Sequence, residues 1–247
     1  MIKIIIKLLL KINPKFLLLE IYTRNFQDGF LLNLLILSSI KKPKIVELGA
    51  HGHNQGLIGL SSHIFLNEEY LLLDAFQNNL NEINLITNKY KLKNIYTKKF
   101  FINPKTNPEK LDNFIKEKMP NFEFADLLIM DIDGYERNIL KKLNFFSPFL
   151  IFVEENKNFK NSIAMKQIKK KKYFSLGTFD GNFIFCKKKI INKEINFKKT
   201  KLNKLLIILL KINSKFFLGL FIKIHNKNYE IKELIDKPNQ FNNVVKY

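Results

Sequence analysis

Short apolar runs, most of them ending in an acidic residue, recur through the middle of the chain. Such continuous runs are typical of strands buried on both faces of a parallel sheet. Helix-compatible stretches at 77–90, 108–118 and 135–143 separate them. The predicted strands cover residues 44–48, 70–74, 95–101, 126–131 and 149–154. Strands that alternate with helices indicate an α/β domain, with a mostly parallel sheet and helices on both faces.

The last part of this region departs from the alternation. Residues 173–179 and 182–187 are joined by Asp180-Gly181, a dipeptide typical of tight hairpin turns. We expect a helix over 160–172 before this hairpin. A parallel sheet that ends in an antiparallel hairpin is typical of class I methyltransferases, whereas a dinucleotide-binding dehydrogenase more often repeats the parallel unit. The pattern therefore predicts a Rossmann-like fold of the class I methyltransferase type.

The two ends of the chain are rich in Leu, Ile and Phe with lysines at intervals, and 10–16 recurs with one change as 210–216. Neither end reaches the roughly 20 uninterrupted apolar residues of a membrane span. We expect basic apolar helices that pack on the core or on a second subunit, or that contact an anionic membrane surface through 1–20 and 201–224. The predicted organisation is an N-terminal helix over 1–24, a methyltransferase-like domain over 25–190, and a C-terminal helix with a polar tail over 191–247.

Composition restricts the partners of the protein and its compartment. The 247 residues carry a formal net charge of +20, but only Arg24 and Arg137 are arginines. Because arginine is the residue that reads phosphates and bases bidentately, a surface of lysines favours diffuse attraction and makes nucleic acid the least favoured partner. The single cysteine, Cys186, excludes an internal disulfide framework, and it fits a cytoplasmic protein.

Acidic residues stand where the predicted parallel strands end. In open parallel sheets ligands bind beyond the carboxyl ends of the strands, so these carboxylates are candidates for one shared site. Each also has a simpler interpretation as a helix cap, a turn or an ion-pair partner. The acids are Glu47, Asp74, Asp131, Asp133 and Glu154, and the glycines Gly49 and Gly52 follow the first of them.

Two further interpretations of this region are weaker. His51 and His53 could act as a general base near neutral pH, but surface histidines that orient a loop are more common. Asp131 and Asp133 could bind a divalent cation, but without a third carboxylate in the local motif we predict no metal site.

On these residues the sequence resembles the FkbM-type methyltransferase family. The most specific part is 126–136, similar to the family's Asp-x-Glu-Gly-x-Glu block, with Asp133 in place of the commoner glutamate. The resemblance covers roughly residues 25–187 and departs from the family pattern at His53 and Ile129. The other matching stretches are 46–50, 110–114 and 152–156, followed by the hairpin.

The resemblance implies S-adenosylmethionine as the cofactor and assigns roles residue by residue. The implied catalytic residues are Asp131, Asp133, Glu136 and Glu154, with the two aspartates nearest the transferred methyl. The implied cofactor contacts are Glu47, Gly49, Ala50, Gly52, Asp74, Ala75 and Asp112.

The resemblance also implies an O-methyltransferase that acts on a hydroxyl of a sugar or of a cell-surface glycan precursor. Transfer would be direct and in line, aided by alignment and by a base that removes the hydroxyl proton. The alternative is a non-catalytic methyltransferase-like scaffold or a membrane-surface binding protein, which the altered glycine loop and the basic ends favour. We expect a cytoplasmic location, with peripheral contact to the inner face of the membrane as an option.

Overall fold

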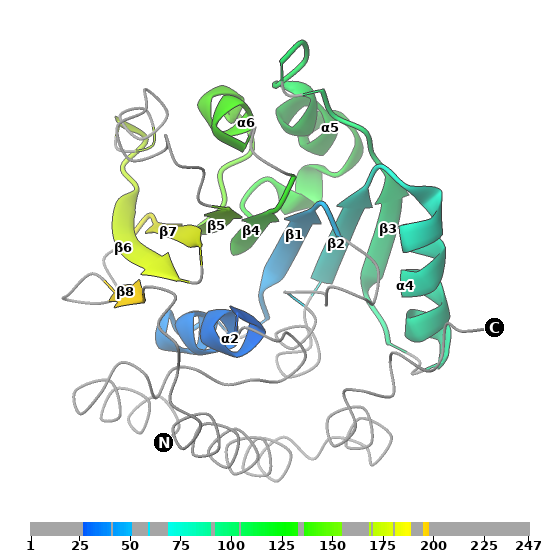
Figure 1. The fold of residues 1–247 in the computed structure, drawn as a ribbon, viewed down its shortest axis with the longest axis horizontal. Helices are drawn as coiled ribbons and strands as arrows, with labels where there is room; N and C mark the ends of the chain where they lie inside the picture. Colours follow the sequence, from blue (N-terminus) through cyan, green and yellow to red (C-terminus); the bar gives the residue numbers. More distant parts are fainter. Residues whose placement is uncertain are drawn as a thin grey trace, which may run out of the picture.

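A single mixed β-sheet organises the computed structural model (Figure 1). The structure describes residues 27–40, 42–50, 59, 69–89, 92–103, 105–132, 136–154, 168, 170–179, 181–188 and 195–197. Within these residues the strand order is β3-β2-β1-β4-β5-β7-β6-β8. The strands are β1 (Lys44–Leu48), β2 (Glu69–Asp74), β3 (Ile95–Lys99), β4 (Leu127–Met130), β5 (Leu150–Glu154), β6 (Phe174–Phe179), β7 (Asn182–Cys186) and β8 (Ile195–Phe197).

The sheet is parallel except around β7. Strands β1 to β5 pair in parallel, β7 runs antiparallel to both β5 and β6, and β8 pairs in parallel with β6. From β1 the chain moves outward through β2 and β3 and then returns to β4 on the other side of β1. This reversal is a topological switch point, where open α/β sheets bind ligands. The predicted fold class, including the terminal hairpin, is confirmed.

Helices cover both faces of the sheet (Figure 1). Helices α5 and α6 lie on one side and α2 lies on the other, while α4 packs along β2 and β3. The described helices are α2 (Gln27–Leu37), α4 (Gln77–Lys89), α5 (Lys110–Lys118), α6 (Glu136–Lys142) and the 3₁₀ turn η2 (Pro120–Phe122).

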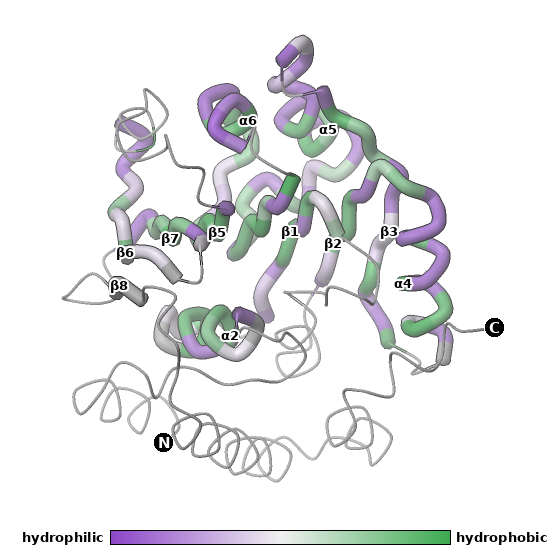
Figure 2. Tube along the Cα trace, viewed as in Figure 1, coloured by the Kyte–Doolittle hydropathy of each residue, from purple (hydrophilic) through white to green (hydrophobic). Residues whose placement is uncertain are grey.

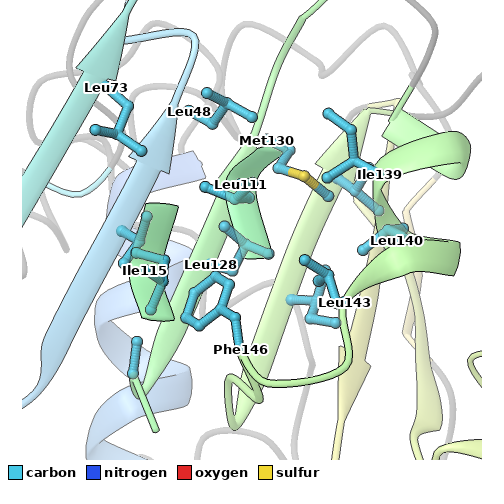
Figure 3. Packing of buried hydrophobic residues seen from close by; sticks show 14 of the residues in the cluster. Leu48, Leu73, Leu111, Ile115, Leu128, Met130, Ile139, Leu140, Leu143 and Phe146 are labelled. Carbon is cyan, nitrogen blue, oxygen red and sulfur yellow. The ribbon is translucent and has the colours of Figure 1, made fainter. Parts of the chain in front are cut away.

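Alternate residues of each central strand point to opposite faces of the sheet. In β1, Val46 and Leu48 pack in a cluster with α5 and α6, so Glu47 between them faces the opposite side of the sheet. Figure 3 shows this cluster, in which Leu111 and Ile115 of α5 lie over Leu128. Figure 2 shows mainly hydrophobic residues in the central strands, whereas α4 contains both hydrophilic and hydrophobic residues. Full burial stabilises each such large apolar side chain by roughly 1.5–3 kcal/mol.

Helix α2 is the element that the apolar pattern did not predict. Its residues Phe30, Leu31, Leu32, Leu34 and Leu35 are all buried. A helix that is apolar on nearly all sides lacks the 3.6-residue alternation by which an amphipathic helix is identified. Strand β8 also adds to the sheet beyond residue 190, where the predicted domain ends.

Several predictions fall wholly or largely outside the described residues. These are the basic apolar helices at the two ends, with their membrane contacts, and most of the helix predicted over 160–172. In the part of the chain that the structure describes, no helix has the length and apolar character needed to cross a membrane.

The single cysteine provides a test of the packing around β7. Cys186 is fully buried, and burial raises the pKa of its thiol from 9.0 to about 11. Because the thiolate is the reactive form, alkylation by iodoacetamide at pH 8 should be at least roughly 100-fold slower in the folded protein than in guanidinium. Mass spectrometry at timed intervals measures this ratio, and similar rates in the two states would contradict the placement of β7.

Candidate active site

The register of the parallel strands brings four sequence-predicted positions to one level of the sheet. Leu48 pairs with both Leu73 and Met130, and Met130 pairs with Val153. The next residue of each strand is therefore level with the others at the carboxyl edge. These residues, which we call the rim, are Asp74, Gly49, Asp131 and Glu154.

Strands β1 and β4 approach each other closely where they leave the sheet. Gly49 has φ +83°, and a Cβ added to it would lie 1.9 Å from the carbonyl oxygen of Asp131. Its N–H donates to the Leu73 carbonyl at 2.9 Å, and the N–H of Asp131 donates to the Leu48 carbonyl at 3.1 Å. Only glycine fits this position, because any side chain would strike the backbone of β4 and would be strained at this φ.

Asp74 ends β2 and begins the turn into α4. Its Oδ1 accepts hydrogen bonds from the N–H of Phe76 at 2.6 Å and from Nδ2 of Asn79 at 3.1 Å. Both hydrogen bonds go to the same oxygen, and among the described residues Oδ2 has no such donor. The Phe76 side chain beside it is 67% exposed. One carboxylate oxygen and one aromatic face therefore lie together at this end of the rim.

Glu47 lies in β1 two residues before Gly49 of the rim, and its side chain is buried in the interior of the protein. It is only 3% exposed, and its Oε2 accepts hydrogen bonds from the Tyr70 hydroxyl and from the N–H of Gly59 at 3.1 Å. A Cβ on Gly59 would lie 2.8 Å from the Tyr70 hydroxyl oxygen, so the three groups are packed tightly. Through these contacts Glu47, one of the expected cofactor contacts, ties Gly59 to the sheet.

Glu136 also has a structural role. It begins α6, is 1% exposed, and its Oε1 accepts a hydrogen bond from the N–H of Ile132 at 3.1 Å. This contact fixes the backbone immediately after Asp131, whose own side chain is half-buried. The structure thus gives Glu136 a positioning role at the rim.

Asp112, one of the expected cofactor contacts, is surrounded by backbone donors. Its Oδ1 accepts from the N–H groups of Asn144 and Phe146 at 2.9 and 2.7 Å, and its Oδ2 accepts from the N–H of Phe145 at 3.0 Å. A carboxylate that takes three backbone donors and is 7% exposed has little capacity left for a ligand. Asp112 holds the connection between α6 and β5, which leads into the opposite end of the sheet.

The remaining predicted residues divide into two groups. Ala50 is buried just beyond Gly49, and Ala75 is half-buried just beyond Asp74. Gly52 and Asp133, together with His51 and His53, lie outside the described residues. Among the described residues, no three His, Cys, Asp or Glu side chains form a group that could hold a metal ion.

Sequence reasoning missed two contributors, Tyr70 and Phe76. A tyrosine within a fully buried strand needs a hydrogen-bond partner for its hydroxyl, and this requirement was the available signal for Tyr70. Phe76 had no such signal, because a single aromatic at the start of a helix is equally consistent with a core position.

Comparison with known proteins identifies the family. A scan against family models matches residues 42–173, more than half of the chain, to the methyltransferase FkbM domain. The chain belongs to the FkbM methyltransferase family. It is therefore an S-adenosylmethionine-dependent methyltransferase. A search of curated proteins gave no match.

Solved structures similar to this FkbM protein include several methyltransferases, all at low identity. A methyltransferase from Geobacter sulfurreducens is 14% identical with a TM-score of 0.42, covering 73% of this chain and 85% of that chain. Monomeric WbdD is 15% identical with a TM-score of 0.44, covering 68% and 46%. The fibrillarin pre-rRNA processing protein of Methanococcus jannaschii is 12% identical with a TM-score of 0.40, covering 59% and 66%.

The described part of the FkbM site fits the cofactor. At the β2 end of the rim, Asp74 is only 3% exposed, and its Oδ2, which has no donor among the described residues, would accept from the ribose hydroxyls, while the exposed Phe76 ring would contact the adenine. Gly49, without a side chain, lets a ligand approach the backbone between β1 and β4. These three residues would hold the nucleoside part of S-adenosylmethionine.

Replacing Tyr70 by Phe tests the link between Glu47 and Gly59. The Glu47 carboxylate would lose a buried donor, which costs roughly 1–3 kcal/mol of folding free energy. We also expect roughly 5- to 30-fold weaker binding of S-adenosylhomocysteine, because Gly59 would be held less firmly. Calorimetric titration and thermal unfolding measure the two effects. Tyr96→Phe, at a partly exposed tyrosine on β3, is the matched control. Equal behaviour of the two variants would refute the positioning role.

Replacing Asp112 separates a structural role from a cofactor role. Asp112→Ala leaves three N–H donors, one of them buried and two part-buried, without their acceptor, and we expect a loss of roughly 3–5 kcal/mol in unfolding free energy. Asp112→Asn keeps Oδ1 as an acceptor and should lose less. In both variants the folded fraction should bind S-adenosylhomocysteine like the original protein. Denaturant unfolding measures the unfolding free energy, and calorimetry measures the affinity for S-adenosylhomocysteine. Weakened binding in a stably folded Asp112→Asn protein would show that Asp112 contacts the cofactor.

Proposed function

We propose that the protein methylates a hydroxyl group of a sugar or of a cell-surface glycan precursor. The observation that supports this most is the pair of carboxylates at the β4 and β5 end of the rim, beside the switch point. Asp131 and Glu154 are level, half-buried, and on adjacent strands about 4.8 Å apart. Asp74 and Phe76 stand at the other end, about two strand spacings from Asp131.

This separation gives the two ends of the rim different tasks. When bound, S-adenosylmethionine supplies a methyl group on a positively charged sulfonium. Asp74 would orient the nucleoside, while Asp131 would accept the proton of the acceptor hydroxyl as its nucleophilic oxygen is aligned. Glu136 keeps the backbone after Asp131 in place through its hydrogen bond to Ile132. Asp133, the other carboxylate of the motif, is proposed to assist.

The chemistry of the rim favours a polyhydroxyl acceptor. A carboxylate accepts hydrogen bonds from hydroxyl groups, and two carboxylates on neighbouring strands can bind two hydroxyls of one sugar ring. The same negative charges would repel the phosphates of a nucleic acid. Despite the net charge of +20, the local charge at the proposed reaction end is therefore unfavourable for DNA or RNA.

Methyl transfer to a panel of sugars and glycan precursors, with labelled S-adenosylmethionine, tests the proposal. In Asp131→Asn we expect kcat to fall at least roughly 100-fold, the size of a general-base contribution, while the affinity for S-adenosylhomocysteine changes little. Asp126→Asn is the matched control at the other end of the same strand, where Asp126 accepts from the N–H of Lys44 at 2.8 Å. Asparagine can accept that hydrogen bond, so the control should keep its activity.

Two results would contradict the proposal in different ways. Unchanged kcat in Asp131→Asn would remove Asp131 from the chemistry. Failure of the folded protein to bind S-adenosylhomocysteine would instead favour the non-catalytic scaffold. Transfer to nucleic acid or protein, with none to sugars, would replace the acceptor class.

A further inference from the structure

A cavity of about 190 Å³ lies at the opposite end of β5 from the rim. It is lined by the end of α6, by the connection from α6 to β5, and by residues beside β6 and β7. Ile151, near the start of β5, borders it, whereas Glu154 at the rim ends the same strand. Three residues of strand separate these positions by about 10 Å. The cavity is therefore distinct from the site of methyl transfer.

Two lysines, Lys171 and Lys187, are among the residues that line this cavity. The Nζ of Lys171 is buried, and among the described residues it has no hydrogen-bond partner. Burial lowers the pKa of Lys171, and attraction to the Asp112 carboxylate opposes that change. A buried ammonium without a partner is costly, so a ligand that accepts its hydrogen bonds would relieve the cost.

Lys187 is held in place by the cavity wall. Its Nζ donates to the carbonyl oxygen of Ser147 at 2.9 Å and to the Ser147 hydroxyl, and it lies 5.7 Å from the ring centre of Tyr173. The Tyr173 hydroxyl in turn donates to the carbonyl of Pro148. These contacts hold the Lys187 ammonium group in place in the absence of a ligand.

The charges and the lining define the ligand. Among the described residues, Asp112 is the carboxylate that acts on Lys171, so it and the two lysines together carry a single net positive charge, which suits a monoanion better than a phosphate dianion. The rest of the wall is mostly apolar, and the volume equals that of roughly six liquid waters. The apolar lining residues are Leu140, Leu143, Phe146, Ile151, Ile168 and Tyr173.

We propose that this cavity binds a small carboxylate with an apolar body. Its carboxylate oxygens would accept from Lys171 and from the available N–H of Lys187, and its apolar part would pack against α6 and Tyr173. Such a ligand would bind the folded protein and not the unfolded chain, so it would raise the unfolding temperature.

Benzoate is a suitable probe for the full-length protein, with benzyl alcohol as its neutral counterpart of similar shape. We expect saturable binding of benzoate by calorimetry and a rise in Tm, at least tenfold weaker binding of benzyl alcohol, and weaker binding of inorganic phosphate. Lys171→Met should reduce benzoate affinity at least tenfold while leaving S-adenosylhomocysteine affinity unchanged. Lys170→Met, at an exposed lysine next in sequence, is the matched control and should bind benzoate normally.

Several outcomes would overturn the inference. These are no benzoate binding to the folded protein, equal binding of benzoate and benzyl alcohol, tighter binding of phosphate, or equal losses in the two lysine variants. The comparison of benzoate with benzyl alcohol uses the unmodified protein, so it decides the matter even if Lys171→Met does not fold.

Discussion

The parallel register of β2, β1, β4 and β5 is the constraint on which the site depends. Because Leu73, Leu48, Met130 and Val153 are aligned, the residues that follow them leave the sheet at one level. Gly49 then allows β1 to pass the Asp131 carbonyl at a distance that excludes a side chain. A shift of one residue in any strand would turn its rim side chain to the other face.

Burial divides the acidic residues of this FkbM protein into two kinds. Glu47, Asp74, Asp112 and Glu136 are nearly inaccessible, and each accepts hydrogen bonds from protein groups. A carboxylate can be buried only when such donors replace water, so these hydrogen bonds help to organise the fold. Asp131 and Glu154 keep partial contact with solvent at the strand ends, and they form the second kind.

The division shows which of the expected site residues are partly exposed and which are buried among protein donors. The predicted strands that end in acidic residues indicated the carboxyl edge of the sheet. Parallel strands all end at that edge, so the acids at their ends lie together. The sequence patterns did not separate Glu47 and Asp112 from Asp131, because the residue type is the same and only the surroundings differ. Tyr70, which supplies the donor for Glu47, is 23 residues away in sequence, and no local pattern connects the two.

The sequence by itself determined the order of strands and helices, the terminal hairpin and the family, because these follow from local apolar patterns, turn chemistry and short motifs. The tertiary structure alone decided which carboxylates are consumed by buried backbone donors, that Gly49 faces the Asp131 carbonyl, and that two lysines from separate segments line one cavity. Each of these depends on contacts between residues far apart in the chain. Their geometry is set by strand register and helix packing, which local sequence does not encode.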